Sequence, residues 1–558
     1  MEADPLSTGK KQDDWTHGLK SNWPVALDLY GSNLPCRLEG EVEDLVSFSI
    51  SENKLQMLDP TTTATDGVIQ VVLGEIPKQI SGTFYRVMTD PFVPPHPKNV
   101  PLDGDGNISA FQIHNGKVDL KTRYVDTERL ILERKAKKAL FGLYRNPFTH
   151  HPCVRAAVDS TANTNLVYWA GHLLALKEGA LPYSVHPTTL ETKGYDPFDQ
   201  IKAKTFTAHP KVDPFSDELV VYGYEAKGLG STDIVTYTID RVGKIKNEFW
   251  FKQPYNTPGL IHDCAITPNW LVLFIWPFEA SVDRMRRGGH HWAWAPDRNF
   301  TITVVPRNAK KPVAQGWKPN EVRSYHWNIC MPIHTAAAWE GKDGHIFVES
   351  SRVYGNVFPF FPPDSPDPVQ DQEAKADFVR WELDLSQPDG ARIADPAVVL
   401  DCPTEFPRID ERFMTHQYDV SWANVFIPQD SDPSKNIFQG LNGLAMHRNS
   451  TGETKWFYAG HDSLIQEPIF IPRTENAPEG DGWVIALIER LGATSRCDLV
   501  VIDTAEFEKP IAFVQLPFHM KAQVHGNWVD AKVLGGYEPM IRQVPDQRIS
   551  GRGALEPL

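Results

Sequence analysis

Short β-rich runs separated by hairpin turns fill most of this 558-residue chain, and they constrain its fold more than any other feature. From Ile69 onward the runs include GTFYRV, ELVVYGY, DIVTYTI, WLVLFIW, FTITVVP, GWVIALI and DLVVIDT. Between such runs lie Gly-containing pairs typical of β-hairpins, in HNGK (114–117), KDGH (342–345), STGE (450–453) and GDGW (480–483). The sequence therefore predicts a mainly antiparallel, all-β protein.

An even spread of short strands over such a length favours a β-propeller. An open sheet of that size would leave long unpaired edges, and the strands do not alternate with helices as in a parallel sheet. Two Pro-rich stretches, 89–101 and 358–371, cannot continue a strand ladder, and we interpret them as surface loops. The aromatic residues of the second stretch would also suit a substrate entrance.

The composition argues against several kinds of partner and location. A net charge of -15 lacks the clustered Lys and Arg that bind nucleic acid. Six scattered Cys residues suggest neither a disulfide framework nor a zinc ribbon, and no stretch is long and apolar enough to span a membrane. We expect a cytoplasmic protein. Residues 130–148 are interpreted as a surface helix or tunnel cap, although an interfacial helix that touches a membrane stays open.

Four well-separated histidines form the main candidate site: His209 in TFTAHPKVDP, His262 in GLIHDCAITP, His334 in MPIHTAAAW and His525 in AQVHGNWV. In a propeller the innermost strands converge on the axis, so one His from each of several blades could meet on one metal ion. Neutral imidazoles bind Fe(II), Zn(II) or Cu(II), and four of them without an anionic ligand favour a non-haem iron oxygenase. The alternative is four ordinary hydrogen-bonded residues, because the chain has 19 His and no HExxH or paired CxxC motif.

Several segments, in order from about Gly74 to Trp528, resemble the carotenoid cleavage oxygenase family. They include GEIPKQISGTFYRV, DGDGNISAFQIHNGKVDLKTRYVDTER, NTNLVYWAGHLLALKEGALPY, the four His contexts, EFPRID (405–410) and QEPIFIPR (466–473). The resemblance implies a seven-bladed propeller with a helical and loop cap over an axial metal site. We accordingly expect a flexible tail over residues 1–20 and a single catalytic propeller domain with cap insertions over 21–558.

The resemblance also implies the residues of the site. Fe(II) would be bound by the four histidines, with Glu178 behind His262, Glu405 behind His334 and Glu467 behind His525. A carboxylate on the far ring nitrogen fixes the tautomer of a ligand histidine and raises its basicity. Thr164, in ANTNLV, matches a family threonine whose methyl group lies beside an open iron position.

Two residues point to the substrate. Lys177 in LLALKEG and Tyr144 in FGLYRNPF make the chain similar to the stilbene-cleaving members of the family. The resemblance then implies an Fe(II)-dependent dioxygenase that cleaves the central double bond of hydroxystilbenes such as resveratrol with O2, giving two aromatic aldehydes. Lys177 and Tyr144 would bind the 4′-hydroxyl group and favour its phenolate. One difficulty is that adjacent residues of a regular strand face opposite sides, so Lys177 and Glu178 should not serve the same cavity.

Other functions stay open at this point. Within the family, the substrate could instead be a carotenoid or apocarotenoid, or a phenylpropene such as isoeugenol. From a different class, the chain could be a propeller that serves only as a binding scaffold, since the fold also hosts proteins that are not enzymes. The sequence does not decide the oligomeric state or the preferred ring substitution.

Overall fold

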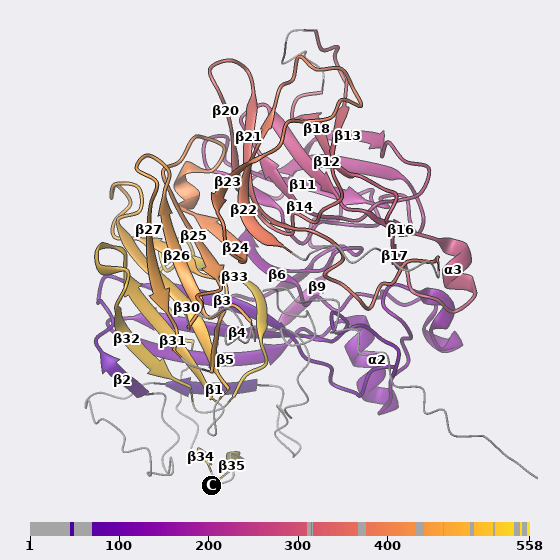
Figure 1. The fold of residues 1–558 in the computed structure, drawn as a ribbon. Coiled ribbons are helices and arrows are strands. Elements are labelled where there is room, and N and C mark those ends of the chain that lie inside the picture. Colours follow the sequence, from indigo (N-terminus) through magenta and orange to yellow (C-terminus); the bar gives the residue numbers. More distant parts are fainter. Residues whose placement is uncertain are drawn as a thin grey trace, which may run out of the picture.

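Seven antiparallel sheets radiate from a common axis and form a seven-bladed β-propeller (Figure 1). The computed structural model describes residues 45–49, 70–309, 314, 316–365, 375–429, 440–460, 462–491, 496–516, 519–540, 547–549 and 555–557. Most innermost strands contact the innermost strand of the next sheet, which builds a ring around the axis. This confirms the predicted all-β propeller and its number of blades. The tail expected over residues 1–20 lies outside the described residues.

We name each blade by its innermost strand. The β33 blade contains β33 (Gln523–Asp530), β3 (Gly82–Thr89), β4 (Gly106–His114), β5 (Lys117–Tyr124) and β1 (Leu45–Ser49). The β6 blade contains β6 (Asn165–Trp169), β7 (His172–Leu176), β8 (Tyr183–Val185) and β9 (Thr192–Tyr195). The β10 blade contains β10 (Lys211–Asp213), β11 (Glu218–Tyr224), β12 (Asp233–Ile239) and β13 (Ile245–Lys252). The β14 blade contains β14 (Ile261–Ile266), β15 (Trp270–Ile275), β18 (Phe300–Pro306) and β19 (Arg323–Trp327).

The remaining three blades follow in chain order. The β20 blade contains β20 (Thr335–Glu340), β21 (Ile346–Val353), β22 (Ala376–Leu383) and β23 (Ala397–Leu400). The β24 blade contains β24 (Thr404–Ile409), β25 (Val420–Val425), β26 (Gly443–Arg448) and β27 (Glu453–Tyr458). The β29 blade contains β29 (Ile469–Pro472), β28 (Ser463–Ile465), β30 (Gly482–Arg490), β31 (Arg496–Asp503), β32 (Pro510–Gln515) and β2 (Gln70–Gly74). A separate two-stranded sheet pairs β34 (Gln547–Ile549) with β35 (Leu555–Pro557).

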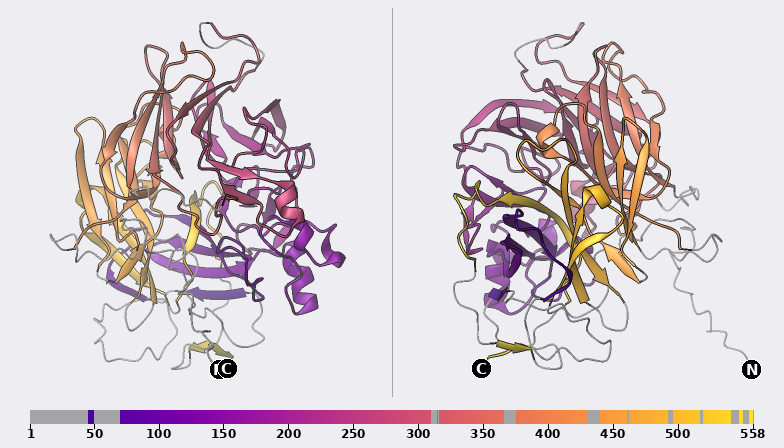
Figure 2. Two further views of the ribbon diagram at one scale, coloured as in Figure 1. Left: turned by 45° about the vertical axis from the view of Figure 1, so that its right-hand side comes forward. Right: turned by 90° about the vertical axis from the view of Figure 1, so that its left-hand side faces the viewer.

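Strands from the two halves of the chain close the ring. Strand β33 pairs with β3 in one blade, while β2 pairs with β32 in the neighbouring blade. Figure 2 shows the yellow C-terminal strands beside the indigo N-terminal ones. Because each side of the junction borrows a strand from the far end of the chain, the ring cannot open there without breaking two ladders.

The predicted hairpin turns connect neighbouring strands of the blades. Asn115 and Gly116 join β4 to β5 with positive φ values of 50° and 76°, the backbone that an Asn-Gly hairpin turn requires. The other three predicted turns join β20 to β21, β26 to β27 and β29 to β30. Four local turn signals were therefore sufficient to locate four hairpins.

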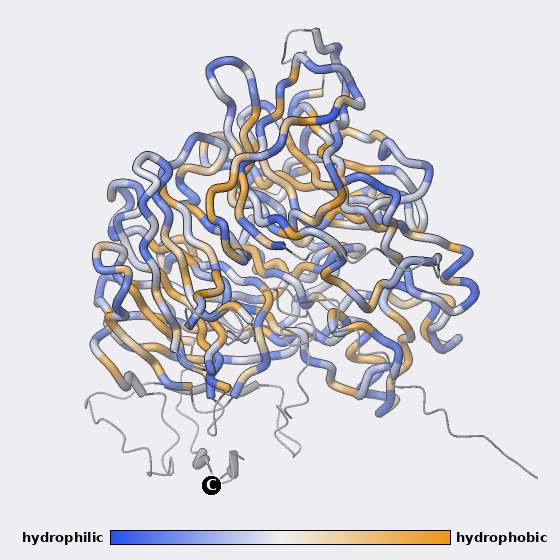
Figure 3. The backbone as a smooth tube through the Cα atoms, in the orientation of Figure 1, coloured by the Kyte–Doolittle hydropathy of each residue, from blue (hydrophilic) through white to orange (hydrophobic). Residues whose placement is uncertain are grey.

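Hydrophobic side chains pack between neighbouring blades, so a central strand is covered on both of its faces. Figure 3 shows hydrophobic residues along many strands of the blades. Trp270, Phe300 and Trp381 belong to one such layer, between the β14 and β20 blades. Every residue of β15 is buried. Burial on both faces explains why runs such as WLVLFIW are continuously apolar instead of alternating with polar residues.

Four long connections at the same end of the propeller form a cap. They join β3 to β4, β5 to β6, β15 to β18 and β21 to β22. The second carries helix α2 (Glu128–Ala136) and the 3-10 turns Pro147–Thr149 and Pro152–Val154, and the third carries β16 (Phe278–Ala280), α3 (Val282–Arg286) and β17 (Trp292–Trp294). Helix α2 buries Leu130, and Glu133 accepts the backbone N–H groups of Leu140 and Phe141. No helix within the described ranges is long and apolar enough to cross a membrane.

One loop differs from its predicted position. The Pro-rich stretch 358–371 was interpreted as a surface loop, but Phe361 is 1% exposed and Phe358 packs against the same core cluster. Both aromatic rings line a cavity under the cap. The interpretation as a surface loop is wrong for these residues. The prolines keep the segment out of the sheet, but burial of the aromatic rings is favourable and draws the loop inward. Residues 366–371 lie outside the described part of the chain.

Gly526 provides a test of the ring closure. A Cβ atom at this position in β33 would lie 2.0 Å from the Tyr85 carbonyl oxygen of β3. We expect Gly526→Ala to lower the free energy of unfolding by roughly 1–3 kcal/mol, the usual cost of overpacking. Denaturant unfolding measures this change. Lys532→Ala, which removes an exposed side chain nearby, should leave the midpoint unchanged, and equal midpoints for both variants would contradict the expectation.

Candidate metal centre and its pocket

Four histidines meet on the axis, each at the start of an innermost strand. His334 directly precedes β20 and His209 lies two residues before β10, while His262 and His525 lie near the beginnings of β14 and β33. One ring nitrogen from each lies within 4.8 Å of those of the others. The Nε2 atoms of His262 and His334 are 3.0 Å apart. The structure thus brings together all four histidines selected from the sequence.

Irregular pairing helps to aim these side chains. The β14–β15 ladder shifts register between Ile261 and Cys264, and the β3–β33 ladder shifts between Arg86 and Met88, opposite His525. Bulges of this kind turn a side chain away from the alternation of a regular strand. They allow an imidazole to point along the axis while its neighbours continue the sheet.

The three blades that lack a metal-site histidine supply the three glutamates. Glu178 follows β7 in the β6 blade, Glu405 lies in β24, and Glu467 lies two residues before β29. Each carboxylate contacts the Nδ1 atom of one histidine: Glu178 with His262, Glu405 with His334, and Glu467 with His525. The last distance is 3.1 Å. These are the three pairs expected from the sequence.

The hydrogen bonds fix the chemistry of the imidazoles. With Nδ1–H donated to a carboxylate, the lone pair of each of these three rings lies on Nε2 and faces the axis. Burial lowers the pKa of His209 and of His525 well below the usual range, so both rings are neutral near pH 7. Neutral rings with inward lone pairs are the form in which histidine binds a metal.

These residues fit a metal ion. The Nε2 atoms of His209 and His525 are buried and find no hydrogen-bond partner among the described residues. Converging lone pairs repel one another and are costly to bury without a partner, and a cation between them removes both penalties. Four neutral nitrogens suit Fe, Zn or Cu. Among the described residues, Asp343, His345 and Glu382 form a second group of potential ligands, at the surface of the β20 blade.

A cavity under the cap opens onto His262, His334 and His525. Its walls are mainly apolar, and three cap connections contribute Leu102, Trp276, Trp292, Val357, Phe358 and Phe361. Leu260 and Ile333, which precede β14 and β20, complete the apolar lining, and the fourth cap connection contributes Tyr144 and Thr164. Trp276 packs against His262 with ring centroids 5.1 Å apart, and Phe406 stacks on His334 at 4.9 Å. The cavity can therefore hold an elongated apolar molecule against the histidines.

One end of the cavity is polar. Lys177 lies over the Tyr144 ring, with Nζ 4.6 Å from the ring centroid, and donates to Asn163 Oδ1 at 3.3 Å. Thr164 Oγ1 donates to the same oxygen at 3.2 Å. Burial lowers the pKa of Lys177 from its usual value to about 8, so the ammonium form still predominates near pH 7. The structure thus places Tyr144, Lys177 and Thr164 in one cavity with the histidines.

The conflict between Lys177 and Glu178 is resolved by the end of the strand. Strand β7 ends at Leu176, and Glu178 lies in a turn with Gly179, whose φ is +88°. Outside a regular strand, adjacent side chains need not face opposite sides. The general rule was correct, but the sequence offered no sign that the strand ended one residue before Lys177.

Several residues of the site were not selected from the sequence. Asp263 is buried between three innermost strands, where it pairs with Lys211 at 2.8 Å and accepts from the Thr335 backbone N–H at 2.8 Å. Asn163 orients Lys177, as described above. Their positions next to His262 and Thr164 were the only available signals, because neither residue forms a motif.

Comparison with known proteins agrees with this site. A family model described as retinal pigment epithelial membrane protein matches residues 58–530. The chain belongs to this family, the carotenoid oxygenases. The resemblance inferred from the sequence is therefore confirmed.

Three relatives illustrate the similarity. The chain is 60% identical to resveratrol cleavage oxygenase 1 of Botryotinia fuckeliana, over 99% of this chain and 95% of that protein. It is 36% identical to isoeugenol monooxygenase of Pseudomonas putida, over 82% and 93%. The crystal structure of Pseudomonas brassicacearum lignostilbene dioxygenase superposes with a TM-score of 0.76 at 36% identity, covering 84% of this chain and 96% of that one.

The carboxylates should control metal affinity. We expect Glu405→Gln to weaken binding of a divalent metal about 10–100-fold, because a neutral amide is a poorer acceptor for the His334 N–H. Anaerobic titration against a competing chelator measures the affinity. Glu382→Gln, in the exposed second group, is the matched control and should change nothing. A larger loss in the control would move the metal site to that surface group.

Proposed function

We propose that this protein is an Fe(II)-dependent dioxygenase that cleaves the central double bond of 4′-hydroxystilbenes such as resveratrol. The products are two aromatic aldehydes, with O2 as the second substrate. The observation that carries the proposal is one polar end, made by Lys177 and Tyr144, in an otherwise apolar cavity that opens onto the four histidines. The names of the stilbene-cleaving relatives support the same substrate class.

The metal-site residues divide the work. His209, His262, His334 and His525 would hold Fe(II), while Glu178, Glu405 and Glu467 orient three of the rings and supply negative charge that neutral ligands lack. When bound, Fe(II) supplies the activation of O2 for reaction with the alkene. Thr164 lines the same cavity as the histidines, and its methyl group would limit which positions around a bound metal are open.

Lys177 and Tyr144 bind the phenol end of the substrate. Lys177 Nζ has three N–H donors, and Asn163 is the one hydrogen-bond acceptor that it has within the described chain, so donors remain for a phenolate oxygen. A buried ammonium favours a nearby anion strongly, because little water screens the pair. Stabilising the phenolate pushes electron density through the ring to the alkene and makes its carbons better nucleophiles.

The aromatic walls orient the rest of the molecule. Trp276, Phe358 and Phe361 offer flat apolar surfaces on which the two rings of a stilbene can pack. With the phenol held at Lys177, the long axis of the substrate runs along the cavity and brings its central bond beside the histidines. The same walls exclude water from the reacting atoms.

Isoeugenol is the second candidate substrate, favoured by the 36% identity to isoeugenol monooxygenase. It also has a phenol that would pair with Lys177, but it fills less of the aromatic cavity. A carotenoid or apocarotenoid has no phenolate to neutralise the buried ammonium, which makes it the weaker candidate. We further propose a cytosolic location, which the five free cysteines of the described chain support.

The first experiment tests metal, reaction and substrate together. Protein reconstituted anaerobically with Fe(II) is incubated with resveratrol and isotopically labelled O2, and products are identified by mass spectrometry. We expect one equivalent of iron, and 4-hydroxybenzaldehyde and 3,5-dihydroxybenzaldehyde in equal amounts. His262→Ala should abolish cleavage. Faster turnover of isoeugenol or an apocarotenal in parallel assays would mean that this compound, and not a stilbene, is the substrate. Full activity in His262→Ala would show that the four histidines are not the metal site.

The role of Lys177 predicts a specific pH dependence. Because burial lowers its pKa to about 8, the ammonium is lost as the pH rises through that value, and kcat/KM for a 4′-hydroxystilbene should fall above it. Lys177→Arg keeps its charge and should not show this fall. Lys177→Met should lose about 100-fold in kcat on the phenol. On the 4′-methyl ether the wild type and Lys177→Met should have equal kcat. A wild type that cleaves the ether and the phenol equally fast would contradict the phenolate role of Lys177.

A further inference from the structure

The three carboxylates behind the metal-site histidines have different electrostatic surroundings. Glu178 also accepts from the neutral Tyr224 hydroxyl at 2.8 Å. Glu405 likewise accepts from neutral groups, the Ser351 hydroxyl and the Phe406 backbone N–H. Glu467, by contrast, contacts two guanidinium groups. The three glutamates therefore differ in the charge of their hydrogen-bond partners.

Arg86 is one of these cations. Its side chain is 0% exposed, and Nη1 lies 3.4 Å from Glu467 Oε2. The same guanidinium donates to the carbonyl oxygens of Glu467, Gln523 and Val524 at 2.8–3.2 Å. Arg86 therefore joins β3 to the segments that carry Glu467 and His525 and is firmly held in place.

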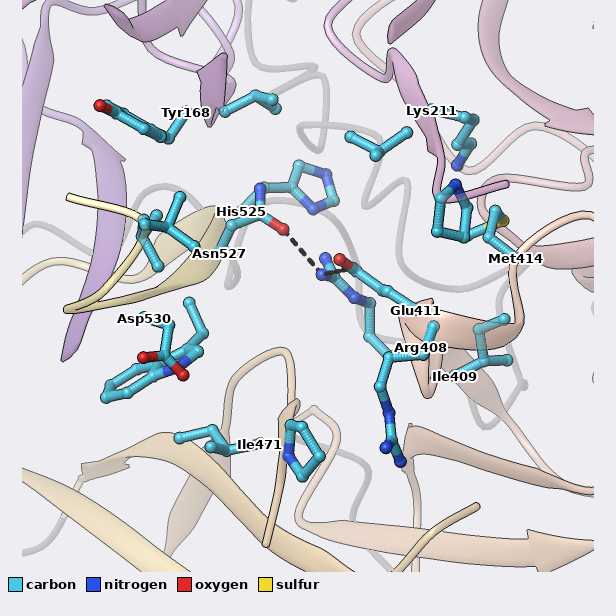
Figure 4. Close-up of a pocket in the computed structure, with 18 of the residues that line it drawn as sticks. Tyr168, Lys211, Arg408, Ile409, Glu411, Met414, Ile471, His525, Asn527 and Asp530 are labelled. Atoms are coloured by element: carbon cyan, nitrogen blue, oxygen red, sulfur yellow. Dashed lines mark hydrogen bonds and ion pairs between the residues drawn. The ribbon is translucent and has the colours of Figure 1, made fainter. Parts of the chain in front are cut away.

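Arg408 is the second cation, and it reaches Glu467 from another cavity. This axial cavity is lined by His209, His334 and His525, on the side of the histidines away from the cap. Figure 4 shows Arg408 extending from the β24 side toward His525 and Asn527. Its Nη1 lies 3.3 Å from Glu467 Oε1, and Nη2 donates to Asn527 Oδ1 at 2.7 Å. Glu411, near the cavity mouth, also pairs with Arg408.

These contacts reduce what Glu467 can give to His525. A carboxylate that accepts from two guanidinium groups and from the Gly526 backbone N–H has less electron density left for the imidazole N–H. The basicity that a carboxylate adds to a ligand histidine falls accordingly. Glu178 and Glu405 touch only neutral donors besides their histidines among the described contacts. Glu178 and Glu405 thus add more basicity to His262 and His334 than Glu467 adds to His525.

We propose that Arg408, together with Arg86, is a positioning residue that withdraws charge from Glu467 and makes His525 the weakest donor of the three carboxylate-backed histidines. The inference rests on the metal site of the proposed function. A weaker donor and two nearby cations disfavour the more highly charged Fe(III) relative to Fe(II). Arg408 therefore keeps the bound iron in the ferrous state that reacts with O2.

The test uses Arg408→Gln, which removes the charge but keeps a donor. We expect Fe(II) binding about 3–10-fold tighter in a chelator competition, and a lower Fe(III)/Fe(II) midpoint potential in a redox titration. KM for the stilbene should not change, because Arg408 faces the axial cavity and not the cap cavity. Arg408→Lys, which keeps the charge, should restore the wild-type values.

Two further variants guard against misfolding and general charge effects. Glu411→Gln removes a partner of Arg408 at a position whose side chain is 56% exposed, so it should fold normally. It frees Arg408 to act more strongly on Glu467, and we expect shifts in the opposite direction, toward weaker binding and a higher potential. Arg473 lines the same cavity, but its charge is paired with Asp481 and Asp503. Arg473→Gln should therefore change neither the Fe(II) affinity nor the midpoint potential.

The outcomes separate the possibilities. Loss of metal in Arg408→Gln with an unchanged potential in whatever iron remains would mean that Arg408 merely holds Glu467 in place, and the inference would be wrong. The same is true if Arg408→Lys and Arg408→Gln behave alike. If the wild type binds no iron at the four histidines, the proposed metal site fails first and the inference fails with it.

Discussion

The structure depends on four imidazoles whose ring nitrogens face one another on the propeller axis, three of them buried and that of His262 partly buried. Such an arrangement is unfavourable by itself, because the nitrogens repel one another and the Nε2 atoms of His209 and His525 have no hydrogen-bond partner among the described residues. Two features make it tolerable: a cation fits between the rings, and three of them donate Nδ1–H to a buried glutamate. Seven blades provide seven innermost strands; four of them have a metal-site histidine at or near their beginning, and the blades of the other three contribute the glutamates. The ring is thus used completely, with no blade left without a part in the site.

Much of this could be predicted from the sequence, and the limits have physical causes. Turn signals such as Asn115–Gly116 are local, so they located hairpins correctly. The four histidines could be chosen because their segments resemble a known family, and a propeller explains how the starts of distant strands come together. Burial of Phe358 and Phe361 was not predicted. The prolines around them indicate a loop, but they do not indicate whether the loop packs inward or faces solvent. Asp263 and Arg408 escaped notice for a related reason: their partners lie on other blades, and only the folded ring shows which charge meets which.

The site separates two kinds of chemistry on two sides of the histidines. On the cap side the walls are mainly aromatic, and Lys177 is the one Lys or Arg among the described lining residues, which in the proposed function binds the phenol. On the axial side the lining contains the charged Lys211, Asp263 and Arg408. Lys211 and Asp263 pair with each other, and Arg408 contacts the carboxylate of Glu467. An apolar substrate is therefore expected to enter from the cap side, while the charged groups lie on the other side of the histidines.

Phe406 lies at the boundary between these two sides, and its backbone is strained there. It lines both cavities, stacks on His334, and has a φ of 50°, a region that bulky residues avoid. The strain coincides with the register shift of β24 between Glu405 and Arg408. That shift lets three nearly consecutive residues of one strand act separately: Glu405 on His334, Phe406 as the partition, and Arg408 on Glu467. A regular strand would place Glu405 and Arg408 on opposite faces, so the strained residue is what allows one strand to serve two different carboxylate-histidine pairs.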